Sequence, residues 1–384
     1  MTHQTPRYTG WKAGISFTAL SLLTLTGCSD SDGGGNDGLR TGTLFTQGIE
    51  NIHYETRSQS GTTDEAGEFR FRPGETLTFR VGNLVLADDI PAAPFLSPID
   101  FTANARTRLH KGGADEGEDL TTHRTTEVAL ANNNAVAINI TRLLTALAEQ
   151  ENVRSSDETL EITERTIDQL NDYLADDSNP EIDFSTTVEA FARPENISEE
   201  NRDKAGDLAN PSPANQLLDN ICFAAKGSEL CEKPPVDGPN NELSEEQSDK
   251  RSRILNARRT LDEAPANNAI DFLESETLDF RNDLATAFYL EPETLTLDPS
   301  DGRIKEVAIR RTGSSGYSLK RLDAITKGKG WAIHGVNRQE GTVEFYRNTS
   351  QPAEDGTIVL SFKVDYPDFD NYRWFRKNLL VEIN

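Results

Sequence analysis

The side chains best suited to metal or acid–base chemistry lie in one acidic loop. His110 and His123 flank residues 111–119, a stretch that carries four carboxylates. Imidazole nitrogens and carboxylate oxygens are common ligands of divalent metal ions. The loop lacks the ligand spacing of a known metal site. We therefore interpret it as a mobile acidic loop, with a metal centre as the alternative.

Motifs for nucleophilic or phosphate chemistry are not found in the sequence. The run Gly313-Ser314-Ser315-Gly316 lacks the residue between serine and glycine that a G-x-S-x-G nucleophile elbow requires. There is no G-x-x-x-x-G-K-[ST] phosphate loop and no H-E-x-x-H zinc motif. Among 64 acidic residues, any pair of carboxylates could arise by chance. We therefore predict no catalytic residues and no enzymatic activity.

Three aspartates near the C-terminus have a spacing that could bind calcium weakly. Asp365, Asp368 and Asp370 are not followed by the central glycine or the terminal glutamate of an EF-hand loop. This pattern favours a solvated turn. We expect no metal ion and no cofactor.

The aromatic and basic run at residues 372–377 is the candidate ligand contact. Trp and Arg are enriched at binding hot spots, and aromatic rings can stack on sugars. The candidate contact residues are Tyr372, Arg373, Trp374 and Arg376. The alternative is that Trp374 and Phe375 are buried in the domain while the two arginines pair with neighbouring aspartates.

The N-terminus has the pattern of an export signal. Residues 1–14 carry two basic and no acidic side chains, and residues 15–26 form an apolar run that is too short to span a membrane. The run ends in Leu25-Thr26-Gly27-Cys28, followed by a Gly/Asp-rich stretch, which resembles the acylation signal of bacterial lipoproteins. The resemblance implies removal of residues 1–27 and lipid attachment to Cys28. An ordinary secretory signal with an incidental Cys28 is the alternative.

The lipoprotein resemblance also implies a location. Ser29 directly after Cys28 implies sorting to the outer membrane, with the lipid as the membrane anchor. Residues 28–41 are predicted to be a flexible tether with a reach on the order of 20 Å. The formal net charge of −25 disfavours nucleic acid and anionic headgroups as partners.

The remaining cysteines, Cys222 and Cys231, are candidates for a disulfide. Disulfides persist in the oxidising compartment that the export signal implies. Closing a loop of about 10 residues would contribute roughly 2–3 kcal/mol on the chain-entropy model. Two free thiols or a metal pair are the alternatives, although no histidine lies nearby in the sequence to complete a zinc site.

Residues 42–101 are predicted to be β-rich, because the runs at residues 69–72 and 77–81 alternate apolar and polar side chains with a period of two, as half-buried strands do. In the same region, the run from Gly61 to Phe69 resembles the G-x-T-D-x-x-G-x-F core of carboxypeptidase-regulatory and transthyretin-like β-sandwiches. The chain is also similar to uncharacterised proteobacterial lipoproteins in which such a domain precedes an N-I-x-R-L-L helix. Residues 139–144 match that motif. The resemblance implies a fold and no reaction.

Residues 127–233 have helical periodicity. Two predicted helices have an apolar face, which we expect to pack in a domain core. A groove that binds a partner is the alternative. One face consists of Val136, Ile140, Leu143, Leu144 and Leu147, and the other of Ile167, Leu170, Tyr173 and Leu174. Turn-forming residues at 234–243 predict a linker.

The C-terminal part is predicted to begin with a polar helix from Ser244, a plausible N-cap, to about Leu261. Its basic stretch at residues 250–259 could meet an acidic partner, but a solvated face or intramolecular pairing is preferred. From about Asn267 onward, alternating patterns and turn residues predict a second β-sandwich.

Together these patterns predict an α+β multidomain protein with an N-terminal β-sandwich, a helical middle segment and a C-terminal β-sandwich. The predicted domains are a signal peptide (1–27), a tether (28–41), a β-sandwich (42–126), a helical domain (127–233), a linker (234–243) and a helix plus β-sandwich (244–384). The expected function is that of a lipid-anchored, non-enzymatic binding or scaffold module of the cell envelope, with an envelope protein or glycan as partner. A surface adhesin or assembly subunit, an accessory lipoprotein of an envelope transporter, and a hydrolase with an unrecognised site are the alternatives.

Overall fold

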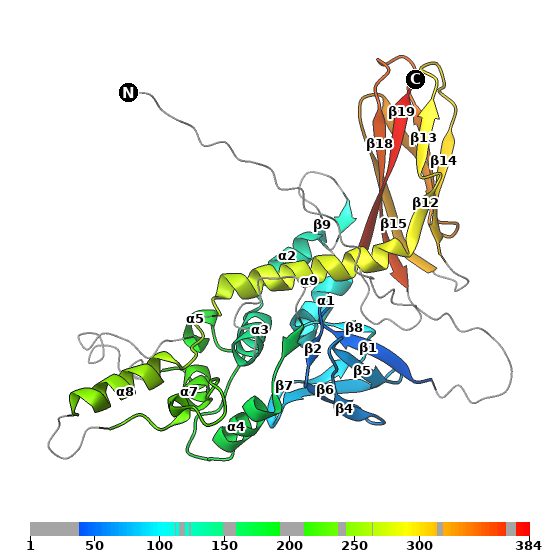
Figure 1. Cartoon of the computed structure of the whole chain (residues 1–384). Coiled ribbons are helices and arrows are strands. Elements are labelled where there is room, and N and C mark those ends of the chain that lie inside the picture. The colour runs from blue at the N-terminus through cyan, green and yellow to red at the C-terminus, as the bar shows by residue number, and fades with distance from the viewer. Residues whose placement is uncertain are drawn as a thin grey trace, which may run out of the picture.

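The computed structural model describes residues 38–111, 113–114, 120–122, 124–148, 159–192, 211–236, 243–262, 264–312, 318–365 and 374–384. Within these ranges, N-terminal sheets are followed by a helical middle and a C-terminal pair of sheets (Figure 1). The predicted α+β multidomain class is confirmed. The signal peptide, Cys28 and most of the tether lie outside the described residues.

The N-terminal sheets form a small β-sandwich. One sheet has the strand order β5-β1-β8 and the other the order β4-β3-β6-β7. The strands are β1 (Arg40–Leu44), β3 (His53–Glu55), β4 (Ser60–Thr62), β5 (Glu68–Phe71), β6 (Thr76–Val81), β7 (Leu84–Pro91) and β8 (Phe95–Leu96). Phe69 of the first sheet meets Phe79 of the second edge to face, with ring centroids 5.4 Å apart. The predicted alternation therefore places its aromatic side chains between the two sheets.

The turn before β5 explains why this part of the sequence carries Asp64 and Gly67. The Asp64 carboxylate accepts hydrogen bonds from the N–H groups of Ala66 and Glu68, at 3.0 and 2.9 Å. Gly67 has φ of 70°, and a Cβ there would lie 2.4 Å from the carbonyl oxygen of Leu44. Only glycine fits this backbone. The motif thus serves the turn between two strands.

The middle segment consists of short helices packed on the sandwich. The helices are α1 (Ala103–Lys111), α2 (Arg124–Asn133), α3 (Ala135–Leu147), α4 (Glu164–Leu174), α5 (Val188–Phe191), α7 (Pro213–Asn220) and α8 (Glu245–Asn256). The predicted apolar face of α3 is buried, with Ile140, Leu143, Leu144 and Leu147 each at most 1 % exposed. These residues share one hydrophobic core with the N-terminal sandwich. Sandwich and helices are therefore one packed unit, here called the N-terminal unit.

A long helix, α9 (Ala266–Thr286), occupies a region where the sequence analysis predicts β structure. The prediction from Asn267 onward was wrong for this stretch. Its buried side includes Leu273 and Phe280, but also Glu276 and Thr277. Two polar residues on the inner face interrupt the apolar stripe by which an amphipathic helix is recognised.

The segment leading into α9 packs on the N-terminal unit. α8 begins at the predicted N-cap, Ser244, whose hydroxyl accepts from the N–H of Gln247 at 3.3 Å. Leu261 and Ala264 are buried in the core of the N-terminal unit. The structure thus differs from the predicted grouping of residues 244–261 with the C-terminal sandwich. The C-terminal hydrophobic core begins at the end of α9, where Ala285 and Ala287 pack against it.

The C-terminal sandwich has two four-stranded sheets, with orders β12-β14-β17-β16 and β13-β19-β18-β15. Its strands are β12 (Phe288–Glu291), β13 (Thr294–Leu297), β14 (Lys305–Arg311), β15 (Ser318–Lys327), β16 (Trp331–Asn337), β17 (Thr342–Arg347), β18 (Gly356–Asp365) and β19 (Trp374–Ile383). The sequence pattern predicts β14, β17, β18 and β19. In the charged β15, and in β16, the alternation is weaker.

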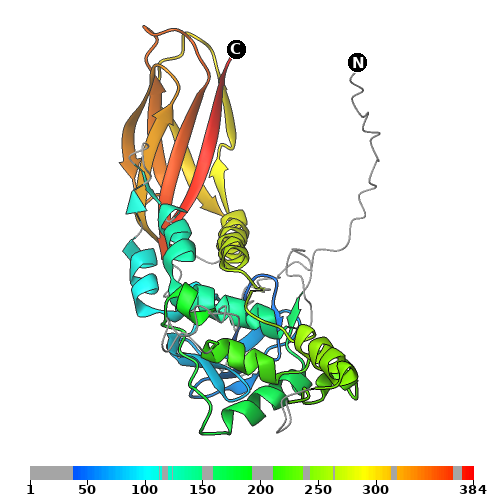
Figure 2. The same ribbon diagram turned by 90° about the vertical axis from the view of Figure 1, so that its left-hand side faces the viewer.

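Shorter elements are the strand pair β2 (Ile49–Glu50) and β11 (Leu160–Glu161), the strand pair β9 (Gly113–Ala114) and β10 (Thr121–Thr122), and the 3₁₀ helices Pro98–Phe101 and Glu229–Cys231. The C-terminal sandwich stands at the end of α9 and projects away from the N-terminal unit in both views (Figures 1 and 2). Among the described helices, none combines the length and hydropathy needed to cross a membrane.

Candidate functional site

The described part of the predicted ligand cluster is buried in the C-terminal sandwich. Trp374 and Phe375 are each 3 % exposed. The Phe375 ring contacts Phe288 and Phe362, with centroids 5.5 and 5.6 Å apart. Arg376 is half-buried on the same strand. This arrangement supports the alternative in which the aromatic residues serve the core.

Several predicted site residues lie outside the described residues. They are Tyr372, Arg373, Asp368, Asp370, His123, Ser314, Ser315 and Cys28. His110 is described at the end of α1, where its carbonyl oxygen accepts from Lys363 Nζ at 2.6 Å. In the ranges that the structure describes, no group of three or more metal-ligating side chains is close enough to hold an ion.

Cys222 and Cys231 form a disulfide with an S–S distance of 2.05 Å. Arg165 of α4 donates to the Cys231 sulfur at 3.2 Å and to the carbonyl of Ala224 at 2.6 Å. The N–H of Cys222 donates to the side chain of Gln169 at 2.9 Å. The bridge therefore closes a loop that is fastened to one face of α4.

The basic stretch of α8 is engaged by acidic residues of the same chain. Lys250 pairs with Glu232, and Arg253 pairs with Glu229 at 3.0 Å, so two carboxylates at the end of the disulfide loop hold the helix. Arg259 instead turns inward, donating to the carbonyl of Ala146 at 3.1 Å. Intramolecular pairing, the preferred interpretation of this stretch, is what the structure contains.

The two polar residues of the N-I-x-R-L-L motif are buried on α3 and bind backbone. Arg142 is 4 % exposed and donates to the carbonyls of Ala264 at 2.6 Å and Leu261 at 2.8 Å. Asn139, fully buried, donates to the carbonyls of Phe184 and Thr186, both at 3.0 Å. Burial lowers the pKa of the Arg142 guanidinium. Asn139 and Arg142 thus supply hydrogen-bond donors to backbone carbonyls of irregular segments, because these carbonyls have no partner in a helix or a β-sheet.

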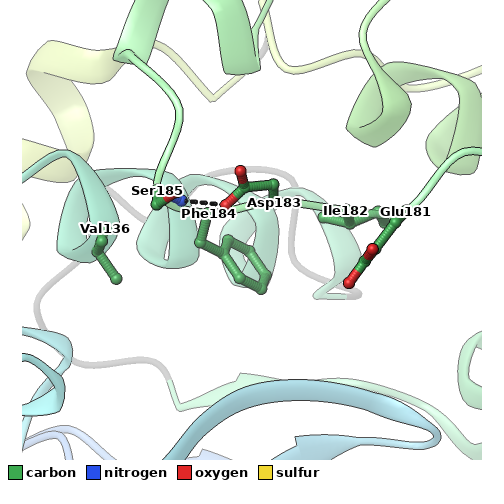
Figure 3. Close-up of a pocket in the computed structure, with 6 residues that line it drawn as sticks. All are labelled: Val136, Glu181, Ile182, Asp183, Phe184 and Ser185. Atoms are coloured by element: carbon green, nitrogen blue, oxygen red, sulfur yellow. Dashed lines mark hydrogen bonds between the residues drawn. The ribbon is translucent and has the colours of Figure 1, made fainter.

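Beside Asn139 lies a shallow groove with a volume of about 380 Å³ (Figure 3). It is lined by Val136 of α3 and by residues 181–185. Asp183 accepts from the N–H of Ser185 at 2.8 Å, and bonding to Ser185 holds the pKa of this carboxyl below its usual range. Because Asp183 stays ionised and exposed, it suits polar contact with a cation better than proton transfer.

Glu276 is a buried carboxyl that sequence analysis did not single out. It lies on the inner face of α9 with no exposed surface. Thr46 Oγ1, in the loop after β1, donates to Glu276 Oε1 at 2.6 Å, and the N–H of Thr46 donates to Oε2. Burial raises the pKa of Glu276 to about 7, whereas hydrogen bonds from Thr46 and from the backbone of Gln47 oppose this rise. A glutamate among apolar helix positions is the sequence signal that could have drawn attention to it.

Comparison with known proteins adds no relative that bears on fold or function. No protein-family model and no curated protein sequence matches the chain. One similar structure is a nucleoside hydrolase-related hypothetical protein from Saccharophagus degradans that is associated with carbohydrate metabolism. It has 7% identity and a TM-score of 0.21, over 50% of this chain and 56% of that one. A second is the twitchin kinase region from C. elegans, with 9% identity and a TM-score of 0.15, over 69% of this chain and 43% of that one. The chain thus spans about half the length of each, and at these TM-scores neither likeness supports an argument.

Proposed function

We propose that this protein is a lipid-anchored protein of the cell envelope that acts as a non-enzymatic binding or scaffold module. The lipid would be attached to Cys28, with the outer membrane as location. The sequence Leu25-Thr26-Gly27-Cys28 supports the anchor, and Ser29 supports the location. The partner is an envelope protein or a glycan rather than nucleic acid, which the negative charge of the chain would repel.

The observation that carries the proposal is the position of the C-terminal sandwich. The tether enters the N-terminal unit at β1, whereas the C-terminal sandwich projects from the end of α9, with the chain's C-terminus at its far tip (Figures 1 and 2). A domain held away from the anchored end is well placed to meet a partner. In the N-terminal unit, the buried Asn139, Arg142 and Arg259 bind backbone carbonyls, which supports a structural role for that unit.

Site-specific photo-crosslinking in living cells tests which part of the molecule meets a partner. A photoreactive residue would replace Leu380 or Val336, two exposed apolar positions of the C-terminal sandwich, at 54% and 42% exposure. Val85 and Val128 of the N-terminal unit, at 40% and 44%, are matched controls. We expect adducts from the C-terminal positions. Adducts confined to the N-terminal positions would contradict the proposal.

The lipid anchor has a separate test. Membrane fractions from cells that produce the wild-type protein or Cys28→Ala would be compared, and the N-terminal peptide would be weighed by mass spectrometry. We expect an acylated Cys28 at the wild-type N-terminus and loss of membrane association in the variant. A Cys28→Ala protein that stays in the membrane, together with an unacylated native N-terminus, would refute the anchor.

A further inference from the structure

The hydrogen bonds of Glu276 join two parts of the chain that are far apart in sequence. Thr46 lies 230 residues before Glu276, and it bonds both carboxylate oxygens. The loop residues 45–48 carry no charged side chain. Among the described residues, no lysine, arginine or histidine pairs with Glu276. A carboxylate here would thus be buried without a counter-ion, which costs free energy.

The charged groups near Glu276 do not change this conclusion. Asp279, one turn along α9, raises the pKa of Glu276 further. Arg281 of α9 is already paired with Glu127 of α2, at 2.7 Å. A neutral Glu276, in contrast, keeps its bonding, because its acid O–H can donate to Thr46 Oγ1 while the other oxygen accepts the Thr46 N–H.

Glu276 also sits in the middle of the contact that holds α9 on the N-terminal unit. On one side, Phe272 meets Phe45 edge to face, with centroids 5.3 Å apart. On the other side, Phe280 stacks on Phe95 of β8 at 3.9 Å. The helix ends at Thr286, and β12 of the C-terminal sandwich begins two residues later. The attachment of α9, together with the hydrogen bond from Lys363 of β18 to the carbonyl of His110 in α1, therefore sets the position of the C-terminal sandwich.

We propose that Glu276 and Thr46 form a proton-sensitive joint between the N-terminal unit and the helix that carries the C-terminal sandwich. With a proton on Glu276 the joint is closed, and loss of the proton weakens it. The joint would make the presentation of the C-terminal sandwich depend on pH near neutrality. This inference does not depend on the lipid anchor or on the identity of a partner.

Hydrogen exchange measured by mass spectrometry on the full mature chain, between pH 6 and pH 8, tests the joint. Rates would be corrected for the pH dependence of intrinsic exchange, and peptides from α9 and residues 44–48 would be compared with peptides from β17. The pKa of Glu276 is about 7 in the closed joint and should be ordinary in the open one. Protection from hydrogen exchange should therefore fall about tenfold over this interval. Peptides from β17 should not change.

Glu276→Gln, a neutral isostere, should keep the protection of α9 and lose its pH dependence. Asp271→Asn, at an exposed carboxylate of the same helix, is the matched control and should behave like the wild type. If Glu276→Gln fails to fold, Thr46→Val gives a second test. It removes a hydrogen bond that lowers the pKa of Glu276, so the pH transition should move upward. Protection of α9 that does not vary with pH, that varies equally in Glu276→Gln, or that falls in parallel in β17 would overturn the proposal.

Discussion

The N-terminal unit and the C-terminal sandwich are held together in different ways. The C-terminal core is made of apolar and aromatic side chains between two regular sheets, whose backbone groups are paired by long ladders. The N-terminal unit contains irregular segments between short helices, and Asn139, Arg142 and Arg259 bind their carbonyls from within the core. A core that encloses irregular backbone needs buried polar side chains, since each unpaired carbonyl would cost free energy. Regular strands remove that need, and at the loops of the C-terminal sandwich the buried Arg347 acts in the same way, donating to the carbonyls of Pro299 and Gln351.

Substitutions that destabilise each region separately test this difference most directly. Trp331 and Trp374 both lie in the C-terminal sandwich, and the third tryptophan, Trp11, belongs to the predicted signal peptide. Tryptophan fluorescence of the mature chain should therefore follow the C-terminal sandwich. Circular dichroism at the helix band should follow mainly the N-terminal unit and α9.

The largest effect is expected from Phe362→Ala. Phe362 is fully buried and contacts Phe288 and Phe375. Its truncation should lower the free energy of unfolding of the C-terminal sandwich by about 3–5 kcal/mol, because a cavity remains. Urea titration should show this in the fluorescence transition. Phe362→Leu should cost less than about 1.5 kcal/mol, and an equal shift in the helix signal would mean that the two regions unfold as one.

Arg142→Met should destabilise the N-terminal unit and leave the stability of the C-terminal sandwich unchanged. It leaves the carbonyls of Ala264 and Leu261 buried without their donor, which should destabilise the N-terminal unit by about 3 kcal/mol. The helix signal should shift in urea while the fluorescence transition stays in place. Arg253→Met, at an exposed ion pair, is the control and should cost under about 1 kcal/mol. Equal effects of the two variants would argue against the structural role of the buried arginine.

The pH dependence of stability should also belong to the N-terminal unit. The pKa of Glu276 is about 7 in the folded protein, against 4.5 for the free side chain. The stabilisation from its bound proton is therefore fully present below pH 4.5, and it is lost as pH rises through 7. The helix transition in urea should lose at most about 3 kcal/mol over this range. Glu276→Gln should abolish that loss. A wild-type transition whose stability rises over the same interval would contradict the assignment.

Reduction of the Cys222–Cys231 disulfide should have the smallest of these effects. The short loop predicts a loss of about 2–3 kcal/mol on the chain-entropy model. Because this loop holds α4 and α8, the helix transition should shift in urea with a dithiol present, and Cys222→Ser with Cys231→Ser should reproduce the shift. A shift of the fluorescence transition alone would mean that the disulfide stabilises the C-terminal sandwich, and it would contradict this prediction.

Much of this molecule follows from local patterns in the sequence. The period-two runs at residues 69–72 and 77–81 and in β17, β18 and β19 predict strands, because a strand exposes alternate side chains to its two faces. The apolar face of α3 and the N-cap Ser244 predict helices for the same kind of local reason. The closeness of Cys222 and Cys231 in the sequence is also enough to suggest their pairing.

The candidate functional residues were less predictable. Trp374 and Phe375 look like binding residues in the sequence, but their burial depends on β12 and β18, which cover the same core. The helix α9 was not predicted because its inner face carries Glu276, whose hydrogen-bond partner, Thr46, is distant in the sequence. No local pattern reports such a contact.

Local sequence patterns are enough to predict the alternation of the strands, the amphipathic helices and the turn at Gly67, since each depends on neighbours a few residues away. Its N-terminal pattern is also the whole basis for proposing a lipid anchor. The folded structure was needed to see that the first sandwich and the helices share one core, that α9 joins it to the second sandwich, and that a carboxyl is buried at the joint. These features depend on contacts between segments tens to hundreds of residues apart, and the energy of such contacts comes from burial and hydrogen bonding that exist only after the chain has folded.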